Sequence, residues 1–587
     1  MTNHSILKIN NLNVEFFPDG EIIKAVDNIS FELNKGEVLG IVGESGSGKS
    51  VTALSVLRLI SSPPGKISSG EIIFQKLSGE KTDLLKLPER EMQKIRGNEI
   101  SMIFQEPMTS LNPVMKCGKQ IVEAILQHQK ISKKEAKQKT ISLFEKVLLP
   151  NPENIFNSYP FEISGGQKQR VMIAMALSCN PSVLIADEPT TAIDVTVQKT
   201  ILELLKKLQK DLNLSIIFIT HDLAVVSEIA QKILVMFKGK IVEQGNTNQV
   251  FKSPQHPYTK SLLACRPPLN KQLSKLPVIS DFLEINNNGE IKSKNSTIEN
   301  ILNTYSLNIE ERKSLQNKLY SEEPILQIKN LKTYFPLNEG IIFKSKNFTK
   351  AVDDISFDVY KGETLGLVGE SGCGKTTLGR TILRLIEATS GQIIYKGKDL
   401  TMLSNKEMKA LRKNIQIIFQ DPYSSLNPRI TIGSAIEEPM KVFRILNNYK
   451  ERKNKTIEIL EKVGLNESHF NRYPHEFSGG QRQRICIARA LALNPEFIVC
   501  DESVSALDVS VQAQVLNLFN DLKNDFGFTY IFISHDLSVV KFMSDRLIVM
   551  NNGKIEEMNF ANEVYKNPQS DYTKKLINSI PKIEIEN

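Results

Sequence analysis

Two glycine-rich segments carry the residues of a phosphate-binding loop, in the pattern G-x-x-x-x-G-K-[ST]. The segments are Gly43, Glu44, Ser45, Gly46, Ser47, Gly48, Lys49, Ser50 and Gly369, Glu370, Ser371, Gly372, Cys373, Gly374, Lys375, Thr376. In such a loop, backbone N–H groups surround the phosphates of a nucleotide, the lysine reaches the terminal phosphates, and the Ser or Thr hydroxyl binds Mg²⁺. The chain is therefore expected to bind two nucleotides.

The elements around each loop agree with this expectation. Apolar runs at 37–42 and 364–368 predict a strand before each loop. Helical spacing predicts a helix after each loop, from the apolar residues Ala53, Val56, Leu57, Ile60 and Leu378, Ile382, Leu385, Ile386. The phosphates would then lie at helix N-termini, where free N–H groups and the helix dipole favour negative charge.

Two later apolar runs each end in a pair of acids, Asp187-Glu188 and Asp501-Glu502. A continuous apolar run suits a central parallel strand that is covered on both faces. We expect the first acid of each pair to hold Mg²⁺ through water, and the second to polarise an attacking water. Together with a phosphate loop, these acids predict nucleotide hydrolysis.

Two further motifs recur at matched positions. An apolar run ends in His221 and its counterpart in His535, and the chain holds only seven histidines, which favours a functional role over core packing. Upstream of each acid pair stand Ser164, Gly165, Gly166, Gln167 and Ser478, Gly479, Gly480, Gln481. A serine at a helix start with two glycines behind it presents a hydroxyl and open N–H groups to an anion. A plain helix cap is the alternative, and the recurrence argues against it.

The chain is a tandem of one module. Residues 25–31 match 351–357, and residues 103–107 match 418–422. The stretch 267–323 between the modules is dense in Asn, Lys, Glu and Ser, so we expect a linker too polar to offset its ordering entropy, with a polar helix compatible with 298–319. The chain is divided into a first module with the start of an extension (1–265), a linker (266–323) and a second module (324–587).

Composition excludes several functional classes. The net charge of +8 is spread over 587 residues, unlike the basic stripe of a nucleic-acid binder. The six cysteines form no C-x-x-C pair, which favours reduced thiols in the cytosol. We expect no secretory signal, and no apolar run approaches the ~18–20 residues that span a bilayer. A membrane role would therefore run through partners on the cytosolic face.

The motifs, twice in the same order, resemble the ATP-binding cassette (ABC) ATPases. The order is phosphate loop, Gln after an apolar run, Ser-Gly-Gly-Gln, Asp-Glu, Ala-Ile-Asp or Ala-Leu-Asp, then His. The resemblance implies an α/β fold of two P-loop modules, each with a parallel-sheet core, an antiparallel β subdomain and a helical subdomain at roughly 107–164 and 422–478. It also implies head-to-tail modules, so that each ATP lies between one phosphate loop and the other module's Ser-Gly-Gly-Gln.

The same resemblance assigns two composite sites. One would use Lys49, Ser50, Gln105, Asp187, Glu188 and His221 with Ser478 and Gly480; the other would use Lys375, Thr376, Gln420, Asp501, Glu502 and His535 with Ser164 and Gly166. Gln105 and Gln420 would join the hydroxyls and the first acids as Mg²⁺ ligands, at the joint between core and helical subdomain. Adenine would stack on Phe16 and Phe335, with Phe17, Tyr334 or ordinary core phenylalanines as alternatives. Since no acid or histidine is missing, both sites are expected to hydrolyse ATP.

Two segments resemble the dipeptide/oligopeptide importers of this family. One is the nine-residue run at 105–113 and 420–428, and the other is the His-Pro-Tyr-Thr stretch at 253–263, echoed at 567–573, which begins a carboxyl-terminal extension. An ordinary proline turn into a helix is the alternative for the second. The fused arrangement resembles the ATP-binding subunit of microcin C-type and related peptide importers.

This resemblance implies partners and a place in the cell. They are two integral permease subunits, an extracytoplasmic peptide-binding protein, no nucleic acid, and a peripheral position on the cytoplasmic face of the inner membrane. Many relatives hold an iron–sulfur cluster with cysteines of the extension, but only Cys265 lies nearby, so no cluster is expected. The rivals are a soluble tandem ATPase on ribosomes or DNA, and a sugar importer with one degenerate site.

Overall fold

The parallel strands at the centre of each module are apolar on both faces. The computed structural model describes residues 5–17, 21–105, 110–190, 193–285, 291–294, 296–307, 314, 316, 319–336 and 348–581. Every residue is buried in the strands β3 (Val38–Val42), β7 (Val183–Asp187), β8 (Ser215–Thr220), β15 (Thr364–Val368), β19 (Phe497–Asp501) and β20 (Thr529–Ile533). Helices must therefore cover both faces of these sheets.

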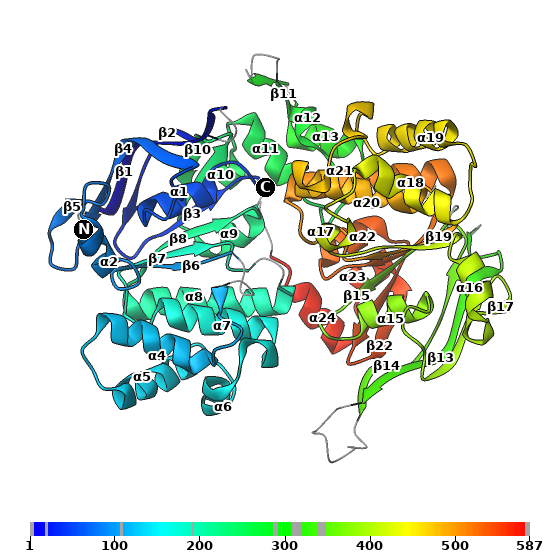
Figure 1. Cartoon of the computed structure of the whole chain (residues 1–587), viewed down its shortest axis with the longest axis horizontal. Coiled ribbons are helices and arrows are strands. Elements are labelled where there is room, and N and C mark those ends of the chain that lie inside the picture. The colour runs from blue at the N-terminus through cyan, green and yellow to red at the C-terminus, as the bar shows by residue number, and fades with distance from the viewer. Residues whose placement is uncertain are drawn as a thin grey trace.

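The two central sheets share one topology (Figure 1). Their strand orders are β10-β9-β3-β8-β7-β6 and β22-β21-β15-β20-β19-β18, with only β10 and β22 antiparallel to their neighbours. The outer strands are β6 (Ile100–Ile103), β9 (Lys232–Phe237), β10 (Lys240–Asn246), β18 (Ile415–Ile418), β21 (Arg546–Asn551) and β22 (Lys554–Phe560). Because the inner strands are parallel, the segments that follow them meet at one edge of the sheet.

An antiparallel sheet packs against each core, as predicted. The orders are β2-β1-β4-β5 and β14-β13-β16-β17. These strands are β1 (Ser5–Phe16), β2 (Ile23–Asn34), β4 (Gly65–Gln75), β5 (Lys81–Asp83), β13 (Pro324–Pro336), β14 (Phe348–Tyr360), β16 (Ser390–Tyr395) and β17 (Lys398–Asp399). Their apolar faces share one buried cluster with the central strands of the same module, so each antiparallel sheet forms a layer on the core.

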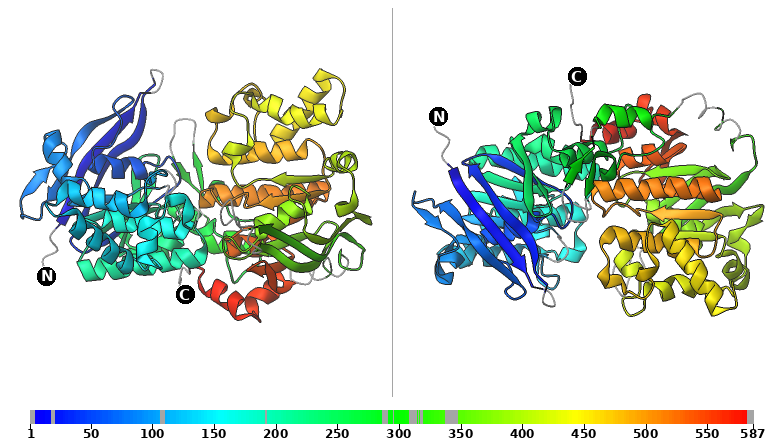
Figure 2. Two further views of the ribbon diagram at one scale, coloured as in Figure 1. Left: turned by 60° about the horizontal axis from the view of Figure 1, so that its bottom comes forward. Right: turned by 90° about the horizontal axis from the view of Figure 1, so that it is seen from above.

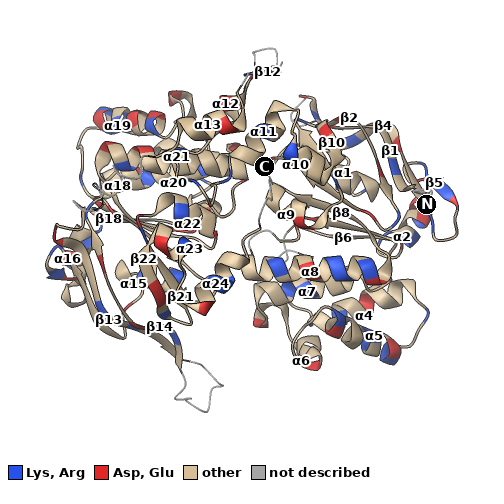
Figure 3. Ribbon diagram, turned by 180° about the vertical axis from the view of Figure 1, so that it is seen from behind, with Lys and Arg blue, Asp and Glu red and all other residues tan. Residues whose placement is uncertain are grey.

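The predicted helical subdomains are also present (Figure 2). They contain α4 (Cys117–His128), α5 (Lys133–Lys146), α6 (Pro152–Asn157) and α7 (Gly165–Ala176) in the first module, and α17 (Pro422–Ser425), α18 (Ile432–Val442), α19 (Tyr449–Lys462) and α20 (Gly479–Leu491) in the second. Short 3₁₀ turns lie at Pro160–Glu162, Leu400–Met402, Glu467–His469 and Pro474–Glu476. Lys or Arg positions and Asp or Glu positions both lie on α5 and on α19 (Figure 3), so neither of these outer helices carries charge of one sign alone.

The remaining helices cover the cores and form the extensions. They are α1 (Lys49–Val56), α2 (Glu89–Ile95), α8 (Val195–Leu212), α9 (Leu223–Ile229), α10 (Thr247–Lys252), α11 (Pro257–Ala264), α15 (Lys375–Ile382), α16 (Asn405–Leu411), α21 (Val509–Phe526), α22 (Leu537–Met543), α23 (Ala561–Lys566) and α24 (Asp571–Asn578). Among the described residues, no helix is long and apolar enough to cross a bilayer.

The helices that follow the phosphate loops are shorter than the apolar spacing predicted. Arg58 (φ 51°) and Arg384 (φ 49°) adopt the left-handed conformation just after α1 and α15, which stops a helix. Ile60, Leu385 and Ile386 therefore lie beyond the helices, and Leu385 is 46% exposed. The periodicity was right for the first two turns only.

The first half of the linker packs against both modules, which corrects the expectation of a segment too polar to offset its ordering entropy. Leu273, Leu276, Phe282 and Leu283 are all buried. Leu273 and Leu276 join the core cluster of the second module, and Leu283 joins that of the first. The side chain of Asn517 on α21 accepts the Leu276 N–H at 2.8 Å and donates to the Leu276 carbonyl at 2.8 Å. A few apolar side chains and the Asn517 amide thus hold the linker against the folded modules, although the average composition of the linker is polar.

The rest of the linker forms short elements. They are α12 (Ile279–Phe282), β11 (Leu283–Ile285), β12 (Ile291–Ser293) and α13 (Ile298–Thr304). Within the range 298–319, where a helix was compatible with the sequence, α13 covers Ile298–Thr304, and residues 314, 316 and 319 are also helical. Residues 308–313, 315, 317 and 318 lie outside the described part of the chain.

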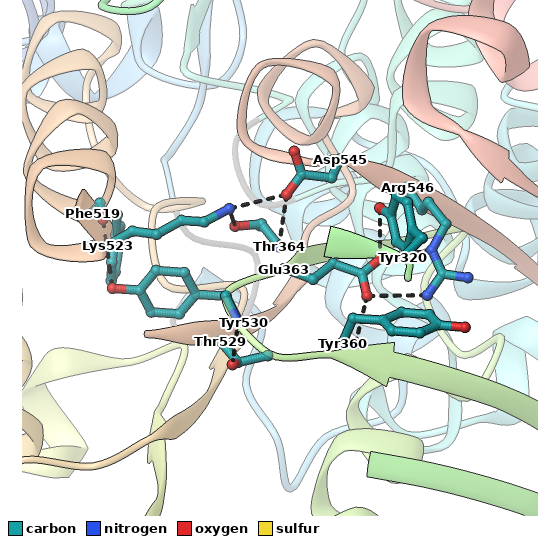
Figure 4. A network of polar contacts seen from close by, with 11 residues as sticks. Tyr320, Tyr360, Glu363, Thr364, Phe519, Lys523, Thr529, Tyr530, Asp545 and Arg546 are labelled. Carbon is teal, nitrogen blue, oxygen red and sulfur yellow. Dashed lines mark hydrogen bonds and ion pairs between the residues drawn. The ribbon is translucent and has the colours of Figure 1, made fainter. Parts of the chain in front are cut away.

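The end of the linker is held by a buried carboxylate (Figure 4). Glu363 is 0% exposed and accepts hydrogen bonds from Arg546 at 2.7 and 3.0 Å and from the Tyr360 N–H at 2.8 Å. The Tyr320 hydroxyl donates to the same carboxylate at 3.2 Å, and its ring packs edge-on against Tyr360. A buried charge requires such pairing. Tyr320 therefore joins the linker to a carboxylate, Glu363, whose charge Arg546 already balances.

We predict that Asn517→Leu loosens the linker from α21. The substitution leaves the Leu276 N–H and carbonyl buried without partners, which costs about 2–4 kcal/mol for the two groups. Amide hydrogen exchange at Leu276 measures this change as a fall in its local opening free energy. Glu203→Leu, at the matching exposed position of α8, is the control and should change stability by less than about 0.5 kcal/mol. Equal exchange at Leu276 in Asn517→Leu and the native chain would contradict the docking role.

Candidate active sites

The phosphate loops adopt the conformation that their glycines allow. A Cβ on Gly48 would lie 2.4 Å from the Ala25 carbonyl oxygen, and one on Gly374 would lie 2.0 Å from that of Ala351, both at positive φ. Lys49 Nζ donates to the carbonyls of Gly43 and Glu44 at 2.7 and 2.8 Å. Lys375 Nζ makes the same two bonds in the second module, at 2.8 and 2.9 Å.

A hydroxyl and an acid stand together behind each loop. Ser50 Oγ donates to Asp187 at 3.1 Å, and Thr376 Oγ1 donates to Asp501 at 2.9 Å. Burial raises the pKa of Asp187 to about 6, although its hydrogen bond from Ser50 opposes the rise, and burial also raises the pKa of Asp501. Asp501 Oδ2 is buried without a hydrogen-bond partner. Hydroxyl and carboxylate oxygens are the ligands that Mg²⁺ prefers, so the donor set fits this ion.

The second acid of each pair is held by a glutamine and a histidine. Gln105 Nε2 donates to Glu188 at 3.1 Å, and His221 Nδ1 lies 3.3 Å from the same carboxylate. Gln420 and His535 make the equivalent contacts with Glu502 at 2.9 and 3.4 Å. The structure therefore brings together the predicted glutamine, acid and histidine in both modules.

Backbone strain marks the same two acids. Glu188 and Glu502 both have φ 48°, a left-handed conformation that costs energy in a residue with a side chain and that clusters at functional sites. Each acid follows directly on the last residue of a buried strand, at Asp187 or Asp501. The strained turn presents the carboxylate at the edge where the phosphate loop begins.

Each acid favours the charged form of its histidine, and in the second module the histidine also favours the charged form of its acid. Burial alone lowers the pKa of His535, but the hydrogen bond and charge of Glu502 outweigh it, and the pKa is raised overall; His221 beside Glu188 shows the same balance. Burial alone raises the pKa of Glu502, but His535 outweighs it, and the pKa is lowered overall. An ionised carboxylate at this place can accept a proton from water.

Each phosphate loop also contacts an aspartate of the other module. Asp508 accepts hydrogen bonds from the Ser45 N–H and hydroxyl, both at 3.1 Å. Asp194 accepts the same pair from Ser371, both at 2.7 Å. In the sequence these aspartates stand at the ends of Ala-Ile-Asp and Ala-Leu-Asp, and no role in a site was predicted for them. Their fixed spacing after the acid pairs was the signal that could have found them.

The Ser-Gly-Gly-Gln segments begin α7 and α20. Ser164 Oγ accepts the Gln167 N–H at 3.3 Å, and Ser478 Oγ accepts the Gln481 N–H at 3.4 Å, so each exposed serine caps its own helix. A Cβ on Gly166 would lie 2.7 Å from Val197, and one on Gly480 would lie 2.3 Å from Val511. The second glycine of each motif is thus needed for close packing on α8 or α21, a role that the sequence did not indicate. Gly165 faces open space, and Gly479 approaches only Leu507, at 4.0 Å.

The aromatic candidates for adenine lie at the ends of β1 and β13. Phe16 is half-buried, Phe17 is 42% exposed and Phe335 is 40% exposed. The Tyr334 hydroxyl donates a hydrogen bond to Asp353, so the polar end of this side chain already has a partner within the protein. Phe16 and Phe335 stay the predicted stacking residues.

Comparison with known sequences identifies the family. The sequence model of the family described as "ABC transporter" matches residues 26–191 and 352–505. The chain belongs to the ABC transporter family. A second family, "Oligopeptide/dipeptide transporter, C-terminal region", matches residues 242–288 and 557–587, and its first match runs past residue 265 into the segment expected to be linker. As an ABC ATPase, the chain binds and hydrolyses ATP.

Similar proteins include close relatives over the full length. "Glutathione import ATP-binding protein GsiA" of Escherichia coli (strain K12) is 48% identical over 585 residues, which cover 99% of this chain and 90% of the relative. The protein of the same name from Shigella flexneri is 47% identical over the same shares. The dimeric ABC cassette MJ0796 bound to ADP and Pi is 28% identical with a TM-score of 0.37, over 40% of this chain and 98% of that one.

The two sites of this ABC chain differ in detail. Arg380 lies 3.8 Å from Asp501 Oδ2, whereas the matching residue of α1 is Leu54. Ser47 of the first loop is replaced by Cys373 in the second. All six cysteines of the chain are buried free thiols. Among the described residues, no three His, Cys, Asp or Glu side chains form a metal-binding group, and the absence of an iron–sulfur cluster stays a prediction.

We predict that Glu188→Gln and Glu502→Gln each lower ATP turnover strongly, by about 10²–10⁴ at the altered site, because an amide cannot accept the proton of the attacking water. Nucleotide should stay bound, since the lysine, hydroxyl and first acid remain. Single-turnover hydrolysis measures the loss, and Glu153→Gln on exposed α6 is the control. Unchanged turnover in Glu502→Gln would show that the second site is regulatory rather than hydrolytic.

Proposed function

We propose that the two ATP sites are composite and drive import of peptides or peptide-like compounds. Modules 1–265 and 324–587 would close on ATP and reopen after hydrolysis, with residues 266–323 between them. The observation that carries the proposal is the pair of reciprocal contacts, Ser45 with Asp508 and Ser371 with Asp194, which face each phosphate loop toward the other module. The intact acid, histidine and glutamine in both modules support hydrolysis at both sites.

Each residue has a proposed task in the first site. Lys49 would leave the loop carbonyls and turn to the terminal phosphates, and Ser50 and Asp187 would hold Mg²⁺. Mg²⁺, when bound, neutralises charge on the phosphate oxygens. Glu188 takes a proton from the attacking water, and His221 orients that carboxylate. Lys375, Thr376, Asp501, Glu502 and His535 have the same tasks in the second site.

The Ser-Gly-Gly-Gln segments would complete the sites from across the interface. Ser478 and Gly480 would face the loop around Lys49, and Ser164 and Gly166 the loop around Lys375, each presenting a helix N-terminus to the terminal phosphate. Gln105 stands where the core meets the helical subdomain and is bonded to Glu188. It is therefore placed to pass the presence of the terminal phosphate to the helical subdomain, as Gln420 is in the second module.

The importer class rests on the extension and on the relatives. Both extensions match the oligopeptide/dipeptide family, and the two relatives described above are named as glutathione import proteins. We propose a short peptide such as glutathione as the transported class. The chain would act on the cytoplasmic face of the inner membrane, bound to two permease subunits, with an extracytoplasmic peptide-binding protein in the complete transporter.

We predict that Ser164→Arg damages the site around Lys375, because a bulky side chain enters the space meant for the terminal phosphate. Site-resolved photolabelling with an azido-ATP under closing conditions should fall at that loop and persist at the loop around Lys49. Ser132→Arg is the matched control, since Ser132 caps α5 of the same module by the same geometry and faces no nucleotide. Loss of labelling only in the altered module's own loop would mean two independent ATPases on one chain.

We predict that the tagged protein, purified from detergent-solubilised membranes, brings down integral permease subunits. Mass spectrometry identifies the partners, and ATP with Glu188→Gln should retain them by holding the modules closed. Recovery of ribosomal proteins in place of permeases would favour the soluble tandem ATPase instead.

A further inference from the structure

The tyrosine of each extension reaches the phosphate loop of its own module. Tyr258, on the first turn of α11, is 0% exposed and packs against Phe237 with ring centroids 4.2 Å apart. Its hydroxyl accepts the backbone N–H of Glu44 at 3.0 Å. In the second module, the Tyr572 hydroxyl accepts the backbone N–H of Glu370 at 3.1 Å. The contact therefore recurs in both copies of the module.

This bond fixes a peptide group that the loop lysine also holds. The Gly43–Glu44 peptide gives its carbonyl to Lys49 at 2.7 Å and its N–H to Tyr258. When a nucleotide binds, the lysine turns to the phosphates and leaves the carbonyl. The tyrosine bond lies on the other side of the peptide and needs no such change. Tyr258 then remains as the hydrogen-bond partner of the Gly43–Glu44 peptide group, while the Ser47 N–H holds the next carbonyl, that of Glu44, at 3.0 Å.

The structure places the tyrosine with equivalent contacts in both extensions. His256 Nδ1 accepts the Tyr258 N–H at 3.2 Å and so caps α11. In the second extension Ser570 replaces this histidine, and its Oγ accepts the Tyr572 N–H at 3.2 Å. A histidine and a serine thus cap the helix in the same way, so capping at this position does not require the histidine of His-Pro-Tyr. The hydroxyl bond to the loop is the feature that both copies keep.

The environment of the first contact favours a neutral tyrosine. Burial raises the pKa of Tyr258, with the Glu44 carboxylate as a further cause, so the hydroxyl keeps its proton. Burial and the facing Asp508 of the second module raise the pKa of Glu44 to about 7, while Lys49 and a hydrogen bond with Tyr258 oppose the rise. Tyr258 therefore contacts both the backbone and the side chain of Glu44, next to the module interface.

We propose that Tyr258 and Tyr572 are positioning residues for ATP, which hold the phosphate loops in the shape that receives the phosphates. The carboxyl-terminal extension of each module is then part of its nucleotide site, in addition to being a segment typical of this class of importers. This inference rests on ATP binding at the two loops, which labelling of the native chain tests independently.

The experiment compares Tyr258→Phe with the native chain by site-resolved azido-ATP photolabelling over a range of concentrations. The substitution keeps the packed ring and leaves the Glu44 N–H without its acceptor. We expect about tenfold weaker binding at the loop around Lys49, equivalent to about 1.4 kcal/mol. Binding at the loop around Lys375 and turnover at saturating ATP should stay unchanged. Tyr572→Phe should give the mirror image.

Tyr565→Phe is the matched control. The hydroxyl of the half-buried Tyr565 donates to the Leu537 carbonyl away from the phosphate loop, and the matching residue in the first module is already Phe251. This variant should label like the native chain. Unchanged binding in Tyr258→Phe, or equal weakening at both loops, would overturn the proposal. Failure of the native chain to label at either loop would instead overturn ATP binding itself.

Discussion

Hydrogen bonds between each phosphate-loop serine and an aspartate of the other module constrain how the two modules face each other. Ser45 and Ser371 each give an N–H and a hydroxyl to one carboxylate. These contacts require that both catalytic edges face inward, toward each other. The parallel sheets make this possible, because the loop, the acid pair and the histidine all follow strands that end at one edge. Each phosphate loop therefore has a contact from the other module, and this is the basis of the proposed composite sites.

The modules share a topology but differ in charge near the sites. Burial raises the pKa of the first acid in both, yet Arg380 favours ionised Asp501, while the hydrophobic Leu54 stands at the matching place near Asp187. The second module also carries the linker contacts, through Asn517 and the Glu363 cluster, whereas the residue that matches Asn517 is the exposed Glu203. Duplication thus preserved the hydrolytic groups, and the surrounding positions diverged.

Much of the site could be predicted because its chemistry is local in sequence. A phosphate loop, an acid pair after an apolar strand and a Ser-Gly-Gly-Gln cap each need only neighbouring residues. The helix ends after Val56 and Ile382 were missed because spacing does not show where an arginine turns left-handed. The Tyr258–Glu44 and Asn517–Leu276 contacts were also missed. They join residues 214 and 241 positions apart, and only the folded chain brings them together. The few apolar residues that pack the linker against the modules were also missed, because the prediction rested on the average composition of the segment.

At each interface these long-range contacts form a closed chain of contacts, or circuit, which starts and ends at the same phosphate loop. From Glu44 the first circuit runs through Tyr258 and α11 to Leu276, which Asn517 holds on α21. The N-cap residue of α21 is Asp508, the partner of Ser45. The second circuit runs from Tyr572 along α24 to the Asn578 carbonyl, which accepts a hydrogen bond from Lys199 on α8 at 3.1 Å. The N-cap residue of α8 is Asp194, the partner of Ser371. In the first circuit the buried Asn517 amide makes two hydrogen bonds to Leu276. In the second circuit the contact is made by the exposed Lys199, and exposed contacts of this kind contribute little to stability. The second circuit is therefore the weaker link, and separation of the modules should begin there.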